Sequence, residues 1–442
     1  MQWGRTVTVI GCHVGGEDNH VIVGGVLPPP GATMFEKKRY LETERSPPRS
    51  SWADGRASSP RSPGRRGSPA SSSTAPTRPI PSATASRCPT CGSPDRGGFR
   101  MSTHPALDLS HTAMSEDEAL RFLDGHRIRM GSRTMDPKAQ IVGEFVKSIR
   151  VPGYYPPLPE LRQQLRAMVN LMDEPAPELA RVEDIRIPGP AGEIPARFYS
   201  STAAKTREPA VAYFHGGGWV QGDLETHNGL CARLAKHARV LVVAVDYRLA
   251  PENKFPAAVE DCFAAYRWLR EKGRDLGADT ARIAVAGDSA GGNLSAVVSQ
   301  LAASAGMPVP TCQALIYPAV DASLETDSHR ELVDGHVIPR ERIIWYMQQY
   351  LRSDADRADS RCSPLRAASL TGQPPAMIVT AGFDPLRDEG RAYGERLREA
   401  GVDVVYREYP GQIHAFVSLT KAIPQGMACT LEIADFLRRR LG

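Results

Sequence analysis

The chain has 442 residues, of which 41% are hydrophobic, 24% charged and 7% aromatic, and this is the composition of an ordinary globular protein. A fibrous, collagen-like or wholly disordered chain is therefore excluded. The net charge of +4 at pH 7 is too small to indicate nucleic acid or an acidic membrane surface as the partner.

The N-terminal quarter differs from the rest of the chain in charge and composition. Residues 1–100 hold 14 lysines and arginines against 7 acidic residues, and the stretch 45–99 consists almost entirely of Ser, Pro, Arg, Gly and Ala. Such a stretch lacks the large apolar residues that would offset the entropy of ordering it. We predict a disordered basic extension over 1–100, and we hypothesise that translation starts at Met101 or Met114.

Neither an export signal nor a membrane anchor is expected. The sequence has no run of about 18 to 20 apolar residues, which a membrane-spanning helix needs, and its opening lacks the apolar core of a signal peptide. The eight cysteines are thinly spread, as in a protein of a reducing compartment such as the cytoplasm. Cys88 and Cys91 form one CxxC pair without a second pair at zinc-binding spacing. No metal and no organic cofactor is therefore expected.

Three helices are predicted before the first strand. A capping box begins at Ser115, and Asp136-Pro137 supplies an N-cap followed by a proline in the first helical position. A third helix follows, because apolar residues recur at helical spacing over 161–172. We predict that residues 101–181 form the N-terminal part of a helical cap.

From residue 182 the pattern changes to short apolar runs that are typical of strands. Residues 182–200 predict two strands joined by a Pro-Gly turn. Further strands are predicted at 209–214, 240–245, 282–287, 313–318, 376–381 and 402–409, and helices at about 225–237, 257–272, 290–304, 387–400 and 425–440. Fully apolar strands alternating with helices indicate an α/β fold in which helices cover both faces of a mostly parallel sheet. This core spans 182–442.

One segment interrupts the alternation of strands and helices. Residues 321–365 are too long for an ordinary connection and contain one clear helix near 339–351. We interpret the segment as a second part of the cap, because long insertions at strand ends usually cover a site. Its histidines, His329 and His336, are expected to be solvated rather than catalytic, with lining of the pocket as the alternative.

The segment GDSAG at 287–291 lies between an apolar strand and a helix. This is the context in which G-x-S-x-G presents a nucleophile, because the flanking glycines permit a sharp turn. Ser289 would then stand at a helix N-terminus, where negative charge is favoured. The alternative is an ordinary Ser/Gly-rich helix cap. Asp288 could serve as a second base, although a structural hydrogen bond is the favoured interpretation.

The segment HGGGW at 215–219 directly follows another predicted strand. Acyl transfer creates a negative oxygen, which backbone N–H groups stabilise, and glycines allow the backbone to approach it closely. A phosphate-binding loop is the alternative, but the Lys-Ser/Thr of a P-loop is missing. We assign the oxyanion hole to the amides of Gly217, Gly218 and Ala290. The substrate pocket is assigned to Gly216, Trp219 and Asp288.

A serine nucleophile needs a base to accept its proton and a carboxylate to orient that base. On this kind of sheet the expected chain order is Ser, Asp or Glu, His. Asp384 and His414 each follow a predicted strand, so both should reach the C-terminal edge of the sheet with Ser289. Asp388 and Glu389 are rival carboxylates, but they fall inside the next predicted helix.

Five ordered motifs resemble those of the hormone-sensitive-lipase-like carboxylesterases in their bacterial form: HGGGW, VDYRLAPENKFPAAVEDC, GDSAGGN, DPLRDEG and GQIHAF. The resemblance covers about 130–442 and implies an eight-stranded α/β-hydrolase core with a helical cap. It also implies Ser289 as nucleophile, Asp384 as acid and His414 as base. Asn253 departs from the family's His or Tyr, outside the chemistry.

The sequence therefore predicts a serine carboxylesterase acting on a small-molecule ester. The resemblance implies short to medium acyl chains. Two alternatives stay open: hydrolysis of amides, lactones, carbamates or acetylated natural products at the same site, and a ligand-binding module with an idle triad. Stable membrane insertion and a nucleic-acid partner are not expected, although the basic extension leaves DNA binding as a third idea. A homodimer is also left open.

Overall fold

The computed structural model describes residues 107–204 and 207–442. The predicted extension over 1–100 lies outside the described residues, and so does its CxxC pair. Of the two alternative start sites, Met101 also lies outside them, whereas Met114 is described. The N-terminal elements are η1 (Leu109–Ala113), α2 (Glu116–Phe122), β1 (Arg129–Met130), β2 (Arg133–Thr134), α3 (Pro137–Ser148) and α4 (Leu158–Met172).

The rest of the described chain alternates between strands and helices. Its elements are β3 (Arg181–Gly189), β4 (Gly192–Ser200), β5 (Glu208–Phe214), α5 (Asn228–Ala238), β6 (Leu241–Val245), α6 (Ala257–Lys272), η2 (Gly273–Leu276), β7 (Ala278–Asp288), α7 (Ala290–Ser304), β8 (Gln313–Ile316), α8 (Asp327–Glu331), α9 (Arg340–Tyr350), η3 (Asp354–Ala358), η4 (Pro364–Arg366), β9 (Ala376–Phe383), α10 (Arg387–Glu399), β10 (Val404–Ile413), η5 (Phe416–Ser418) and α11 (Gln425–Leu441).

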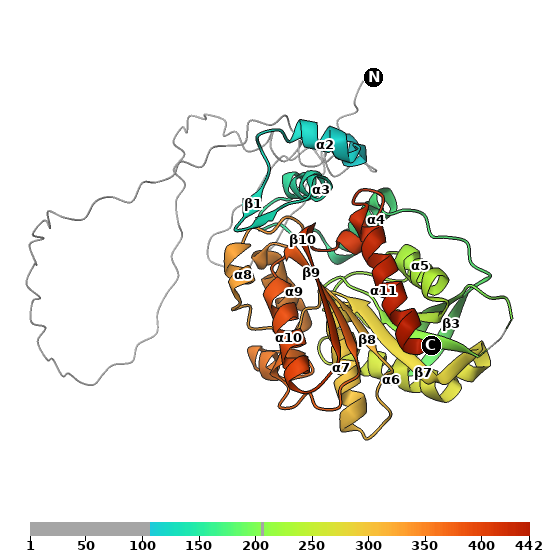
Figure 1. The fold of residues 1–442 in the computed structure, drawn as a ribbon. Coiled ribbons are helices and arrows are strands. Elements are labelled where there is room, and N and C mark those ends of the chain that lie inside the picture. Colours follow the sequence, from blue (N-terminus) through green and yellow to red (C-terminus); the bar gives the residue numbers. More distant parts are fainter. Residues whose placement is uncertain (1–106, 205–206) are drawn as a thin grey trace, which may run out of the picture. The chain divides into compact units, whose positions relative to one another are not determined.

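One sheet of eight strands carries the fold, in the order β10-β9-β8-β7-β5-β6-β4-β3 (Figure 1). The strands from β5 to β10 pair in parallel. Only β4 runs against its neighbours, β3 and β6. The predicted α/β fold with a mostly parallel sheet is thus confirmed.

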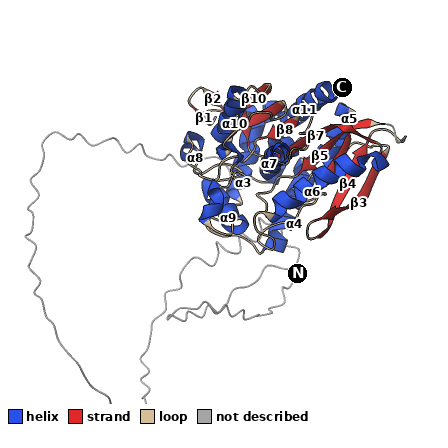
Figure 2. Cartoon of the chain, turned by 90° about the horizontal axis from the view of Figure 1, so that it is seen from below, coloured by secondary structure: helices blue, strands red, loops and turns tan. Residues whose placement is uncertain are grey.

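Each central strand contributes buried side chains to two cores, one on each face of the sheet. In β6, Val242 and Ala244 belong to a cluster with α5 and α11, whereas Val243 belongs to a cluster with α6 and α7. Successive side chains of a strand point to opposite faces, so a strand covered on both faces is apolar throughout. Figure 2 shows the strands lying between helices.

Two helix starts that the sequence predicts are present as expected. Ser115 caps α2, and the carboxylate of Glu118 accepts a hydrogen bond from the Ser115 amide at 2.7 Å. Asp136 caps α3 by accepting from the amide of Lys138 at 3.1 Å. The expectation that only helices precede the first sheet strand is wrong, because β1 and β2 form a small hairpin between α2 and α3. Two-residue strands are too short to leave a periodic pattern in the sequence.

The two segments that the sequence assigns to a cap contact each other. Arg150, just after α3, donates a hydrogen bond to the carbonyl of Gly335 in the insertion at 3.2 Å. Tyr155 stacks on Trp345 of α9 with ring centroids 4.6 Å apart. No helix in the described part of the chain is long and apolar enough to cross a membrane.

Candidate active site

Ser289 stands at the sharp turn between β7 and α7. Its φ of 54° and ψ of −117° are unusual for a residue with a side chain and are the kind of strain found at functional sites. The flanking glycines make this turn possible. A Cβ on Gly291 would lie 1.8 Å from the carbonyl oxygen of Phe214, and one on Gly287 would lie 2.4 Å from the backbone of Gly291.

The structure brings Ser289, His414 and Asp384 together in one hydrogen-bonded line. Nε2 of His414 lies 3.0 Å from Oγ of Ser289, and Nδ1 of His414 lies 2.7 Å from Oδ2 of Asp384. The other carboxylate oxygen, Oδ1, accepts from the amide of Leu386 at 2.9 Å. Each of the three residues directly follows the C-terminal end of a strand, namely β7, β9 or β10. The arrangement can move a proton from a serine hydroxyl to an imidazole.

The rival acids Asp388 and Glu389 point to other partners. Asp388 pairs with Arg387 at 2.9 Å, and Glu389 pairs with His329 at 2.8 Å. The expectation that His329 is solvated is wrong, because its ring is fully buried against this carboxylate. His336 is also mostly covered, and burial lowers its pKa to about 4.

The glycines of the 215–219 loop adopt conformations that residues with side chains avoid. Gly217 has a φ of 120° and Gly218 a φ of 62°, and a Cβ on Gly217 would lie 2.0 Å from the carbonyl oxygen of Gln221. Within the described chain, the amides of Gly217, Gly218 and Ala290 donate to no protein acceptor. They are therefore available to a substrate oxygen, as an oxyanion hole requires.

Asp288 is hydrogen-bonded to this loop on its buried side. Its Oδ1 accepts from the hydroxyl of Tyr213 at 2.7 Å and from the amide of Gly216 at 2.9 Å, and it lies 3.1 Å from Nε2 of His227. Burial would raise the pKa of Asp288, but the neighbouring His227 and Tyr213 outweigh it and lower the pKa below its usual value. Asp288 is thus a structural acceptor.

The three residues predicted for the substrate pocket, Gly216, Trp219 and Asp288, are buried. Asp288 is 5% exposed and Trp219 2%, and the indole of Trp219 stacks on Tyr350 with centroids 4.5 Å apart. Gly216 is buried and has its amide bonded to Asp288. Nε1 of Trp219 is buried without a hydrogen-bond partner among the described residues. The assignment of the three residues to the substrate pocket stays a prediction.

Two residues that the sequence analysis did not identify, one on α4 and one on α9, contact the same loop and the residues that follow it. Arg162 of α4 donates to the carbonyl of Val220 at 2.9 Å. The ring of Tyr346, on α9, covers Gly218 so closely that a Cβ there would lie 2.5 Å from it. Its hydroxyl accepts from Nε2 of Gln221 at 2.9 Å. No local motif marks these residues, because their partners lie far away in the sequence.

The C-terminal end of α4 also supports the segment that follows His414. The carbonyl of Met172 accepts from the amides of Lys421 and Ala422 at 3.0 Å. Asp173 accepts from the amide of Thr420 at 3.1 Å. The helix α4 and the residue after it therefore contact two segments of the site: residues 215–221, which we call the oxyanion loop, and residues 420–422, which follow His414.

Comparison with known proteins identifies the family. The profile of a family described as the alpha/beta hydrolase fold matches residues 211–418. The carboxylic ester hydrolase LipN of Mycobacterium tuberculosis is 43% identical over 326 residues, which is 72% of this chain and 86% of LipN. The ethyl acetate hydrolase of Pseudomonas putida is 37% identical over 289 residues, which is 64% of this chain and 90% of that protein.

Solved structures agree with the sequence comparison. The thermophilic carboxylesterase EstE1, cloned from a metagenomic library, superposes with a TM-score of 0.63 at 41% identity, over 65% of this chain and 98% of EstE1. This chain belongs to the α/β-hydrolase family. Within that family, the resemblance of its motifs to the hormone-sensitive-lipase-like carboxylesterases is confirmed. Among residues 107–204 and 207–442, no group of three or more His, Cys, Asp or Glu side chains is placed to hold a metal ion.

Proposed function

We propose that this protein, a carboxylic ester hydrolase of the family just identified, cleaves its substrates through an acyl-enzyme on Ser289. The observation that carries the proposal is the line from Ser289 to His414 to Asp384, with contacts of 3.0 Å and 2.7 Å. A serine beside an oriented imidazole is the arrangement that activates a hydroxyl for acyl transfer.

The reaction follows from this geometry in two halves. Oγ of Ser289 forms a bond to the ester carbonyl carbon while its proton moves to Nε2 of His414. The carbonyl oxygen becomes negative and binds the amides of Gly217, Gly218 and Ala290. The imidazolium then returns the proton to the leaving alcohol as the C–O bond breaks. Water attacks the acyl-enzyme by the same route, and Asp384 remains ionised throughout.

For the substrate we propose esters of short to medium acyl chains. The name of the ethyl acetate hydrolase relative, at 37% identity, supports this range. The ring of Tyr346 lies against Gly218 of the loop, and we expect it to limit the size of the group that binds beside this glycine. Amide, lactone and carbamate hydrolysis and the idle triad have no such observation in their favour.

A series of p-nitrophenyl esters from acetate to palmitate tests the substrate range on the full chain. We expect turnover on the short esters, a clear fall towards palmitate, and weaker turnover of the matching p-nitroanilides. The highest activity on palmitate would contradict the proposed range. If no ester is hydrolysed, labelling of Ser289 with a fluorophosphonate separates an idle triad from an enzyme whose substrate is not in the series.

The oxyanion loop is tested by Gly217→Val. We expect kcat to fall by about 10² to 10³, the loss that follows removal of one oxyanion donor, because the new side chain would meet Gln221 and displace the loop. The matched control is Gly372→Val, since Gly372 also has a positive φ, of 75°, but has open space around its Cβ position. Equal kcat in the two variants would remove the loop from the mechanism. Circular dichroism checks that both variants fold.

The proposal keeps the predicted cytoplasmic location and a small-molecule partner. The described cysteines are free and buried: Cys231, Cys262, Cys312, Cys362 and Cys429. Burial raises the pKa of the Cys362 thiol to about 12, so that it stays protonated and inert. Cysteines used as buried hydrophobic residues suit a reducing compartment, and cell fractionation checks the location.

A further inference from the structure

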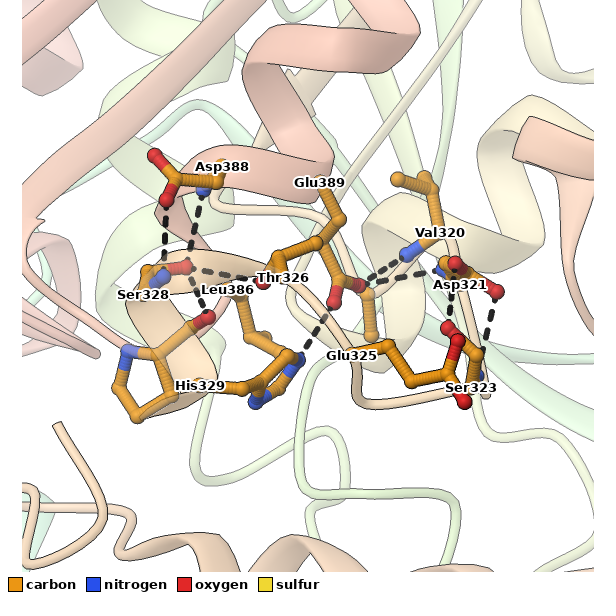
Figure 3. Close-up of polar contacts among 12 residues, drawn as sticks. Val320, Asp321, Ser323, Glu325, Thr326, Ser328, His329, Leu386, Asp388 and Glu389 are labelled. Atoms are coloured by element: carbon orange, nitrogen blue, oxygen red, sulfur yellow. Dashed lines mark hydrogen bonds and ion pairs between the residues drawn. The ribbon is translucent and has the colours of Figure 1, made fainter. Parts of the chain in front are cut away.

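The short helix α8 belongs to the insertion, yet it is bonded to the turn that carries Asp384. The hydroxyl of Ser328 donates to the carbonyl of Pro385 at 2.6 Å, and Pro385 is the residue after Asp384. The amide of Ser328 donates to Oδ2 of Asp388 at 2.8 Å. Figure 3 shows Ser328 facing Asp388 at the start of α10. Part of the cap therefore holds the turn of the catalytic acid.

Glu389, in the first turn of α10, joins α8 to a third segment. Its Oε2 lies 2.8 Å from Nε2 of His329. Its Oε1 accepts from the amides of Val320 and Asp321 at 2.7 Å and 3.2 Å. Figure 3 shows the carboxylate between these two groups, with the imidazole on one side and the two amides on the other. The segment with Val320 and Asp321 leads away from β8.

The hydrogen bonds of this cluster make Glu389 an acceptor. Two amides can only donate, so Glu389 must offer lone pairs to them. Within the described residues, Nδ1 of His329 has no hydrogen-bond partner, so the ring is held through Nε2 alone. Burial raises the pKa of Glu389 above its usual value, although the donors around the carboxylate oppose that rise. A fully buried acceptor with three donors favours one fixed arrangement.

We call the hydrogen-bonded line of Ser289, His414 and Asp384 the catalytic line. The segment that Glu389 holds contacts its other two members, Ser289 and His414. The amide of Ala319 donates to the carbonyl of Ser289 at 3.2 Å. The ring of Tyr317 packs on the ring of His414 with centroids 4.6 Å apart. One side chain, that of Glu389, therefore links the turn of Asp384 to the segment that supports Ser289 and His414.

We propose that Glu389 and Ser328 are positioning residues, which keep the turn of Asp384 and the segment after β8 in register so that the catalytic line retains its geometry. The helix α8 is then a fixed support of the active site and not a moving part of the cap. This inference rests on the proposed function, because it assigns these residues a role in the same reaction.

Substitution at Glu389 tests the proposal. We expect Glu389→Ala to lower kcat on p-nitrophenyl acetate by about 10- to 100-fold with KM within about threefold of wild type, because a displacement near 1 Å can lower a rate by about 10². Glu389→Gln keeps an acceptor for the amides and should retain more of the rate. The matched control is Glu395→Gln, an exposed acid of the same helix, which should leave kcat unchanged.

Ser328→Ala provides a milder variant in case Glu389→Ala does not fold. It removes the hydroxyl's bonds to the carbonyl of Pro385 and to the amide of Asp388. The bond from the Ser328 amide to Oδ2 of Asp388 remains, so kcat should fall severalfold. The control is Ser304→Ala, which loses an exposed hydroxyl bonded only to the carbonyl of Gln300 within α7 and should leave kcat unchanged. Wild-type kcat in folded Glu389→Gln, Ser328→Ala and Glu389→Ala would overturn the proposal. A loss that lies in KM alone would overturn it as well.

A spectroscopic readout separates this inference from the proposed function. The proton in the 2.7 Å contact between Nδ1 of His414 and Asp384 should give a far-downfield ¹H NMR signal, and recording it needs no turnover. We expect the signal to shift or broaden in Glu389→Ala and to persist in Glu395→Gln. If wild type hydrolyses esters but the Glu389 variants keep its kcat and its signal, only the inference fails. If wild type neither hydrolyses esters nor is labelled at Ser289, the proposed function fails, and the signal alone still decides whether Glu389 positions the pair.

Discussion

Replacing Ser289 with alanine should lower kcat for p-nitrophenyl acetate by about 10⁶, because removal of the nucleophile of a serine triad has an effect of this size. The variant should still fold. The hydroxyl of Ser289 is bonded to His414 alone among the described side chains, and alanine demands no more space at the strained turn. The residual rate would come from the oxyanion amides and from substrate binding.

The control for this experiment is Ser295→Ala, six residues further along the chain. Ser295 is a buried serine of the same helix, and its hydroxyl donates to the carbonyl of Gly291 at 2.9 Å without touching the catalytic line. It should keep wild-type turnover. Mass spectrometry after fluorophosphonate treatment should find the adduct on Ser289 in this control. Unchanged turnover in Ser289→Ala would mean that another group is the nucleophile.

The catalytic line was predictable because each member directly follows a strand of a parallel sheet. Ser289 comes one residue after β7 ends, and Asp384 and His414 come one residue after β9 and β10 end. The carboxyl ends of parallel strands share one edge, so short connections leave little freedom in where these side chains lie. The apolar runs that identify the strands are in turn a consequence of burial on both faces of the sheet.

The supports of the line could not be predicted, because they depend on contacts between residues far apart in the sequence. His329 is 60 residues from Glu389, and no local pattern tells a buried imidazole from a solvated one. Tyr346 meets Gln221 across 125 residues. Periodicity reports which face of an element is buried, but not which element covers it.

The second large effect is expected for Asp384→Asn, with kcat lowered by about 10⁴, as when the orienting acid of a serine triad becomes an amide. The reason lies in the two bonds of the carboxylate. Oδ1 accepts from the amide of Leu386 at 2.9 Å, so the oxygen of an asparagine should take that position. Its NH₂ group then faces Nδ1 of His414, and the ring must accept there and carry its proton on Nε2. A ring protonated on Nε2 cannot take the proton of Ser289.

The control is Asp403→Asn, an exposed acid that pairs with Arg440 at the surface and should leave kcat unchanged. Steady-state kcat for both variants, with melting temperatures to show that each is folded, makes the comparison. A loss below tenfold in Asp384→Asn would mean that another carboxylate orients the imidazole. The two described rivals are no ready substitutes, because Asp388 is paired with Arg387 and Glu389 with His329. A loss near 10⁴ would therefore assign the orienting role to Asp384 and leave both rivals as parts of the support behind it.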